Sequence, residues 1–146
     1  ILKKENFELV VQKATEIGVA HITPLESERT IKTGYKIERL ETIMKEAVEQ
    51  SGQSYMPTLA ERATFTDAIA LAGGEMYVMD ASGVPFETLG SLATSVSIFI
   101  GPEGGWSQRE LALAKDSGAH IINLGSSTLR AETAAIIASF AFVNKK

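Results

Sequence analysis

Five consecutive residues, Gly101-Pro102-Glu103-Gly104-Gly105, form the sharpest feature of the sequence that could hold a ligand. Glycine lets a backbone approach a ligand closely, and a helix that follows presents free N–H groups to polar or anionic atoms. The segment lacks the spacing of a dinucleotide-binding fingerprint, and it lacks the Gly-Lys-Ser/Thr ending of a nucleoside-triphosphate loop. The structural alternative is a tight turn between a strand and a helix, because Gly-Pro turns are common.

Two charged residues flank the start of the last apolar segment of the chain. Arg130 follows Leu129 and precedes a run of Ala, Ile and Phe, which is an unusual place for a lone cation. Glu132 falls in the first turn of the expected helix, where simple capping by a negative charge is favourable. Arg130 could likewise be only an ion-pair partner of Glu132 or Glu103. Catalytic and structural roles therefore both stay open for this pair.

Other side chains that carry chemistry are few. The chain has no cysteine and two histidines, which excludes disulfides, thiolate zinc sites, a cysteine nucleophile and a three-histidine metal site. His21 and His120 show no Ser-His-Asp arrangement. Trp106 could stack on a nucleic-acid base or simply cover the glycine-rich loop. We predict no metal, and the lack of cysteine fits a cytoplasmic location.

The composition is that of one globular domain: 146 residues, 45% hydrophobic and 22% charged, with a net charge of −4. No apolar run is long enough to span a membrane. The acidic balance predicts weak RNA binding by these residues alone, since affinity for phosphates comes from clustered Lys and Arg.

Helical and strand patterns alternate along the chain, which predicts an α/β fold with a parallel sheet. We expect helices over residues 7–17, 37–50, 68–72, 107–117 and 131–143, the last one buried nearly all round. We expect strands over residues 19–25, 59–63, 76–79, 96–100 and 120–124, with a turn-rich connection over 81–90. Ligands of such sheets lie beyond the carboxyl ends of the strands. The candidate site is therefore where loops 101–105 and 124–130 meet.

The ordered set of motifs resembles the ribosomal RNA small subunit methyltransferase E family of the SPOUT methyltransferases. The resemblance rests on residues 101–105, Leu124-Gly125 and residues 129–134 (Leu-Arg-Ala-Glu-Thr-Ala), together with residues 12–19, 24–29 and 46–51 upstream. It implies helices on both faces of the parallel sheet and a deep trefoil knot at the C-terminal end. It also implies that residues 1–146 are the methyltransferase domain, that an N-terminal PUA-like RNA-binding domain precedes them, and that the protein is a homodimer.

The same resemblance implies an activity and a set of site residues. Members methylate N3 of a uridine in 16S ribosomal RNA with S-adenosyl-L-methionine, and small-subunit ribosomal RNA is then the partner. The implied catalytic residues are Arg130 and Glu132. The implied cofactor-binding residues are Met79, Ala81, Ile100, Gly101, Pro102, Glu103, Gly104, Gly105, Leu124, Gly125, Ser127, Leu129, Thr133 and Ala134.

Two other functions compete with this one. The chain could be a knotted RNA-binding or ribosome-assembly factor without turnover, or a SPOUT methyltransferase that acts on tRNA. The sequence departs from the family's pattern in two places: Gln53 stands where many relatives have arginine, and Ser127-Thr128 replaces a more usual Arg-Ile or Arg-Val.

Overall fold

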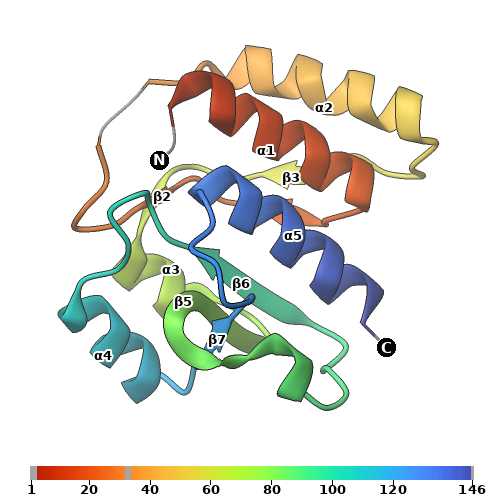
Figure 1. The fold of residues 1–146 in the computed structure, drawn as a ribbon. Helices are drawn as coiled ribbons and strands as arrows, with labels where there is room; N and C mark the ends of the chain where they lie inside the picture. Colours follow the sequence, from red (N-terminus) through yellow and green to blue (C-terminus); the bar gives the residue numbers. More distant parts are fainter. Residues whose placement is uncertain (1–2, 32–33, 146) are drawn as a thin grey trace.

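The computed structural model describes residues 3–31 and 34–145 and has an α/β fold in which every paired strand of the described chain is parallel (Figure 1). The helices are α1 (Lys4–Ile17), α2 (Ile37–Ser51), α3 (Phe65–Leu71), α4 (Gln108–Asp116), α5 (Ala131–Asn144) and the short 3₁₀ helix η1 (Phe86–Thr88). The strands are β1 (His21–Ile22), β2 (Leu25–Glu26), β3 (Thr58–Leu59), β4 (Ala63–Thr64), β5 (Glu75–Pro85), β6 (Val96–Ile100) and β7 (His120–Asn123).

Strand β5 is the centre of the main sheet, between β6 and β7. Three consecutive residues in it, Tyr77, Val78 and Met79, are buried, as expected for a parallel strand covered on both faces. Val78 packs with the residues of α3 and α4, whereas Tyr77 and Met79 pack with Phe142 of α5. The predicted arrangement of helices on both faces of a parallel sheet is confirmed.

The N-terminal half pairs its short strands separately, β1 with β3 and β2 with β4. The prediction of one strand over residues 19–25 was wrong, because Pro24 interrupts the ladder. Proline has no N–H to donate, although its carbonyl accepts a bond from Ala63 N at 3.0 Å. The predicted strand over 59–63 is likewise split into β3 and β4. Above them, α1 and α2 share a core that includes Val11, Leu40 and Met44.

Helix ends follow the expected signals. Gly18 terminates α1 in the left-handed conformation, at φ 97°. The capping box predicted before α4 is present: Ser107 Oγ accepts a bond from Glu110 N, and Glu110 Oε2 accepts one from Ser107 N.

Two expectations about the C-terminal half were wrong. The turn-rich connection does not begin at residue 81: after residues 80–83, which are unpaired with β7, Val84 and Pro85 pair with Ile122 and Asn123 of β7. Helix α5 is not buried all round. It packs on α1 and on β6, but Ile137, Phe140 and Val143 on its other side are exposed.

Candidate functional site

The carboxyl ends of the three main strands lie at one edge of the sheet. Met79 of β5 is in register with Ile100 of β6 and with Ile122 of β7. Strand β6 leads into loop 101–107 and strand β7 leads into loop 124–130. Both loops therefore begin at the carboxyl ends of strands, where ligands of parallel sheets bind. The structure therefore brings the ends of β5, β6 and β7 together, and the predicted cofactor residues Met79, Ile100 and Leu124 share one apolar cluster there.

Trp106 covers the start of the glycine-rich loop rather than offering a surface for a base. Its side chain is buried, and its indole Nε1 donates to the carbonyl of Met79 at 3.0 Å. A Cβ placed on Gly101 would lie 3.0 Å from the Trp106 ring. Glycine at 101 is thus explained by the close approach of the indole, and Trp106 fastens the loop to the end of β5.

The middle of the loop turns back on itself and faces outward. Gly105 N donates to the carbonyl of Pro102 at 2.9 Å, and Gly105 has φ 71°, which favours glycine. Glu103 and Gly104 are exposed. Arg29, from the segment after β2, donates from Nη1 to the carbonyl of Gly104 at 3.0 Å. Sequence reasoning missed Arg29 as part of this site.

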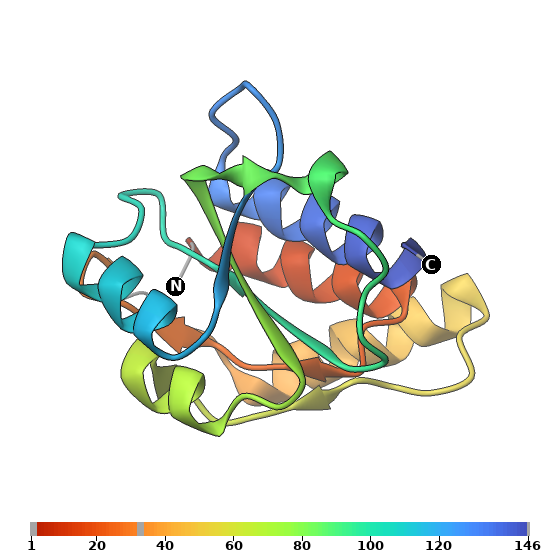
Figure 2. The same ribbon diagram turned by 90° about the horizontal axis from the view of Figure 1, so that it is seen from below.

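The second loop, 124–130, projects from the body of the protein beside the end of β5 (Figure 2). Asn123 anchors its base: the side-chain Nδ2 donates to Ala81 O at 3.1 Å, and Oδ1 accepts from Gly125 N at 2.8 Å. Ala81 and Gly125 are therefore brought together. Ser127 is exposed at the outer part of the loop, and Leu129 is half-buried where the chain returns to α5.

Arg130 and Glu132 do not pair in this structure. Arg130 is exposed, its side chain makes no hydrogen bond or ion pair within the described residues, and its carbonyl accepts from Ala134 N at 2.8 Å. Glu132 is only 9% exposed, and its Oε2 has no hydrogen-bond partner among the described residues. The alternative in which Arg130 pairs with Glu132 or Glu103 was wrong, because no such ion pair occurs within the described residues. Glu132 does lie in the first turn of α5, as the capping alternative expects. Thr133 and Ala134 are half-buried on the same first turns of α5.

A titratable cluster lies near the opposite, amino end of β5. The phenol of Tyr77 donates to Glu75 Oε2 at 2.8 Å, and burial together with this bond raises the pKa of Tyr77 to about 12. The same bond, with one from Ala93 N, lowers the pKa of Glu75. The Tyr77 ring stacks on His120 with 5.3 Å between the centroids. These contacts join the sheet to the β5–β6 connection. The stacking of His120 on Tyr77 gives this histidine a structural role, and no catalytic role is needed to explain it.

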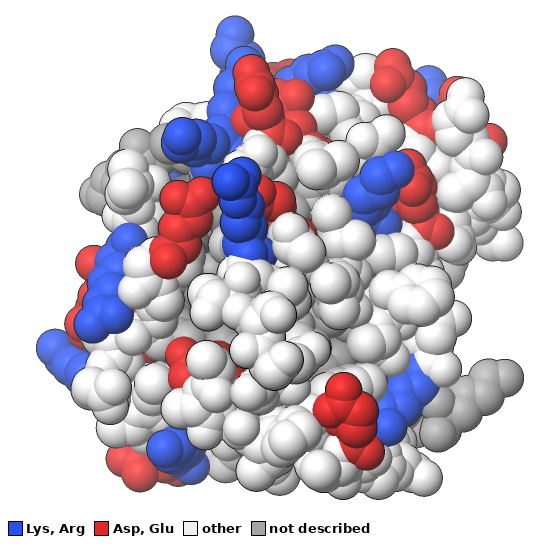
Figure 3. All heavy atoms as spheres, viewed as in Figure 1, with Lys and Arg blue, Asp and Glu red and all other residues white. Residues whose placement is uncertain are grey.

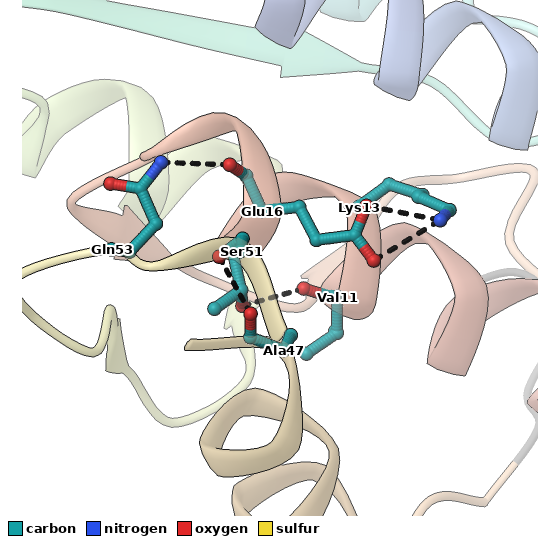
Figure 4. Close-up of polar contacts among 7 residues, drawn as sticks. Val11, Lys13, Glu16, Ala47, Ser51 and Gln53 are labelled. Carbon is teal, nitrogen blue, oxygen red and sulfur yellow. Dashed lines mark hydrogen bonds and ion pairs between the residues drawn. The ribbon is translucent and has the colours of Figure 1, made fainter. Parts of the chain in front are cut away.

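Gln53 is engaged in the N-terminal half (Figure 4). Its Nε2 donates to the carbonyl of Glu16 at 2.8 Å, near the end of α1, and its amide packs against the position where Gly18 would carry a Cβ. Glutamine at 53 therefore completes the C-terminal end of a helix.

A cavity of about 1180 Å³ lies between the two halves of the domain, and only one end of it reaches the first of the two loops. Residues of α1, β1, β6 and α5 line it, and it reaches Gly101 and Pro102 at one end, but loop 124–130 does not line it. The candidate site is accordingly an open edge with a projecting loop.

Across residues 3–31 and 34–145, no three His, Asp or Glu side chains are grouped as metal ligands, and no helix is long and apolar enough to cross a membrane.

The fold and the site together define a class of protein. It is a parallel α/β domain with two candidate ligand-binding loops at the carboxyl ends of its central strands. Within that class, the chain belongs to the RNA methyltransferase domain family, whose model matches residues 1–143. The resemblance seen in the motifs is confirmed.

Individual relatives agree with this family. The chain is 33% identical to the ribosomal RNA small subunit methyltransferase E of Synechocystis sp., over 93% of this chain and 48% of that protein. It is 33% identical to the enzyme of the same name from Rickettsia conorii, over 94% of this chain and 59% of that protein. The chain thus spans about half to three fifths of the length of these relatives.

A solved structure shows the same fold. The ribosomal RNA small subunit methyltransferase E of Neisseria gonorrhoeae, bound to S-adenosyl methionine, superposes with a TM-score of 0.90 at 29% identity, over 97% of this chain and 62% of that one.

Proposed function

We propose that this chain is the catalytic domain of a cytoplasmic methyltransferase that transfers the methyl group of S-adenosyl-L-methionine to N3 of a uridine in 16S ribosomal RNA. The observation that carries the proposal is that β6 and β7, which lead into loops 101–107 and 124–130, end at the same edge of the sheet in a chain of the RNA methyltransferase domain family. Similarity to a relative that binds S-adenosyl methionine supports the choice of cofactor.

The residues at this edge fit the proposed cofactor. Met79, Ile100 and Leu124 offer an apolar wall for an adenine ring. The backbone N–H groups of residues 126–129 make no hydrogen bond within the described chain, so they are available to a polar ligand. We assign the remaining contacts to the predicted cofactor residues around them, namely Ala81, Gly101, Pro102, Glu103, Gly104, Gly105, Gly125, Ser127, Leu129, Thr133 and Ala134.

The chain's own chemistry then falls to two residues. S-adenosyl-L-methionine, when bound, supplies a methyl group that is already activated on a sulfonium. Uracil N3 carries a weakly acidic proton, so the site must remove that proton or stabilise the resulting anion. The guanidinium of Arg130 stays protonated and stabilises negative charge on the uracil carbonyls. The unpartnered Oε2 of Glu132 is the acceptor that we assign to the proton.

We also propose a homodimer and a knotted C-terminal end. The exposed apolar side chains of α5 support the dimer, since unpaired patches of this kind mark protein contacts. The knot is supported by membership of the RNA methyltransferase domain family, together with the motifs of the C-terminal half that imply it. Pulling the ends of the chain apart should leave the unfolded chain shorter than its full contour length if the knot is present.

The test of function is cofactor binding followed by mapping of the product. S-adenosyl-L-methionine should bind saturably in a calorimeter and be competed by S-adenosylhomocysteine. Mass spectrometry of digested RNA should then place the methyl group on uridine N3 of small-subunit RNA. A methyl group on tRNA would favour the related tRNA enzyme. No binding by a folded protein would favour the non-catalytic RNA factor.

A further inference from the structure

The segment 27–30, which follows β2, folds into a closed turn. Ser27 N donates to Thr30 Oγ1 at 2.8 Å, and Thr30 N donates to Ser27 O at 3.1 Å. The two hydroxyl oxygens also lie 3.0 Å apart. The turn belongs to the N-terminal half, about 75 residues before the glycine-rich loop, so any contact between them joins the two halves of the domain.

This turn holds the glycine-rich loop at two points. Arg29 donates from Nη1 to the carbonyl of Gly104 at 3.0 Å. Glu28 N donates to Glu110 Oε1 at 2.8 Å, while Glu110 Oε2 accepts from Ser107 N at 2.8 Å. The buried carboxylate of Glu110 therefore links the turn to the residue at which the loop enters α4.

The Arg29 side chain also covers the loop. A Cβ built on Gly104 would lie 3.4 Å from Cβ and 3.6 Å from Cδ of Arg29. Within the described chain Arg29 forms no ion pair with an acidic residue, so its hydrogen bond to the Gly104 carbonyl is its defined polar contact. An exposed arginine is thus fixed on a loop carbonyl.

The glycine-rich loop depends on contacts from outside because it has few hydrogen bonds within itself. Its internal hydrogen bond is the one from Gly105 N to Pro102 O, and Trp106 holds only its two ends, through Met79 O and the close approach to Gly101. Its outermost residues are exposed. Contacts from outside therefore decide where the Gly104 carbonyl lies.

We propose that Arg29 and Glu110 are positioning residues for the cofactor loop: the turn 27–30 sets the place of the Gly104 peptide from the N-terminal half of the domain. The proposal rests on the proposed function, because it takes loop 101–105 as the cofactor loop. Neither residue is assigned a contact with the reacting atoms.

Arg29→Ala tests the first contact. It should raise the dissociation constant of S-adenosyl-L-methionine and its KM by roughly three- to tenfold, the change that corresponds to one net hydrogen bond. The kcat at saturating cofactor and the melting temperature should stay close to wild type, because the side chain is exposed. Arg29→Lys, which keeps an aliphatic stem and a donor, should recover most of the affinity.

Arg109→Ala is the matched control. This variant removes the same charge from the same region. The Arg109 side chain is 90% exposed, its Nε lies 4.0 Å from Glu28 Oε1, and within the described residues it makes no hydrogen bond to the loop. Its cofactor affinity should equal that of wild type. An equal loss in both variants would show an effect of net charge and would overturn the positioning role.

Glu110→Gln tests the second contact with a local readout. Glutamine has one acceptor oxygen in place of two, so either Glu28 N or Ser107 N loses its partner. Amide hydrogen exchange at residue 28 or 107 should accelerate, and cofactor affinity should fall with it. Unchanged affinity despite faster exchange would show that the link does not position the loop.

The two proposals fail differently. If wild-type protein does not bind S-adenosyl-L-methionine, the proposed function fails. If wild type binds and Arg29→Ala binds equally well, the function stands and the positioning role of Arg29 is wrong.

Discussion

Arg130 and Glu132 lie two residues apart at the start of α5, yet their surroundings are opposite. The guanidinium of Arg130 is exposed without an ionic partner in the described chain, whereas the carboxylate of Glu132 is buried with one oxygen unpaired. An unpaired buried oxygen costs free energy, so a fold that contains one without a function would be less stable for no gain. This contrast separates the two roles and makes each testable.

Arg130→Ala should reduce kcat by at least about 100-fold, the size seen when one donor to developing negative charge is removed. The melting temperature should not move, because the side chain makes no hydrogen bond or ion pair within the described residues. Steady-state methylation of small-subunit RNA and thermal unfolding measure the two quantities. Unchanged methyl transfer would remove Arg130 from the mechanism.

Glu132→Gln should separate stability from activity. Replacing a buried, partly unpaired carboxylate by a neutral amide should raise the free energy of unfolding by about 1 kcal/mol, or about 3 °C in melting temperature, while methyl transfer falls. Glu49→Gln on the exposed side of α2 is the control and should change neither. A loss of stability in Glu132→Gln would show that the carboxylate has a partner in solution.

At the residue scale, the sequence locates the two loops of the candidate site, but it does not predict which side chains contact them. Residues 101–105 and 124–130 could be found because glycine spacing and strand patterns are local signals. Arg29 could not be found, since its contact with Gly104 depends on how segments about 75 residues apart pack. Whether Trp106 stacks on a base or covers the loop could be decided only by its buried hydrogen bond to Met79 O.

At the scale of elements, the irregularity in β5 shapes the carboxyl edge of the sheet, where the candidate site lies. Met79 and Val84 both pair with Ile122, so residues 80–83 leave the ladder and return to it. Gly83 approaches β7 so closely that a Cβ would lie 2.5 Å from the backbone of Ile121. A glycine is needed there because the obstacle is backbone, which cannot turn aside.

Gly83→Ala should therefore push β5 away from β7 and lower the free energy of unfolding by about 2–3 kcal/mol. Gly90→Ala is a matched control, because nothing lies within 4 Å of the corresponding Cβ and its φ is not positive. Urea unfolding of the two variants measures the difference. Equal stability would mean that the chain at 80–83 is free to move away from β7.

The sequence predicts the long elements of the chain well and the short ones poorly. The bounds of β6 are those expected, and α1, α2, α4 and α5 differ from expectation by a few residues, because glycines and a capping box mark their ends. The two-residue strands β1 to β4 carry too few positions to show a period. The exposed side of α5 was missed because its residues are apolar all round, which periodicity cannot distinguish from burial.

At the scale of the whole molecule, charge and apolar surface suggest different partners. Basic and acidic side chains are interspersed on the face shown in Figure 3, and the net charge is −4. Such a surface offers little to a phosphate backbone, so we expect these residues alone to bind RNA weakly. Filter binding at about 150 mM salt checks this, and tight, salt-sensitive binding would contradict it.

The same face carries the exposed apolar side of α5. Phe140 is 60% exposed, Val143 48% and Ile137 42%, and Leu9 of the neighbouring helix α1 is 39% exposed. Helices α1 and α5 lie side by side (Figure 1), so both helices bring exposed apolar residues to this part of the molecule. No charged residue occurs between positions 133 and 144. A second copy of the chain is the partner that we propose for this surface, because self-complementary apolar patches form two-fold dimers.

Phe140→Glu should convert the dimer to a monomer, since burying an unpaired charge in an apolar contact costs several kcal/mol. Leu71→Glu on α3 is the control: it places the same charge at a more exposed apolar residue, outside the α1–α5 surface, and should leave the dimer intact. Sedimentation velocity measures the oligomeric state of both variants.

If the active site is completed at the dimer contact, Phe140→Glu should also lose methyl transfer while keeping its fold. Wild-type protein that sediments as a monomer would overturn the dimer, and a fully active monomer would show that each chain carries a complete site.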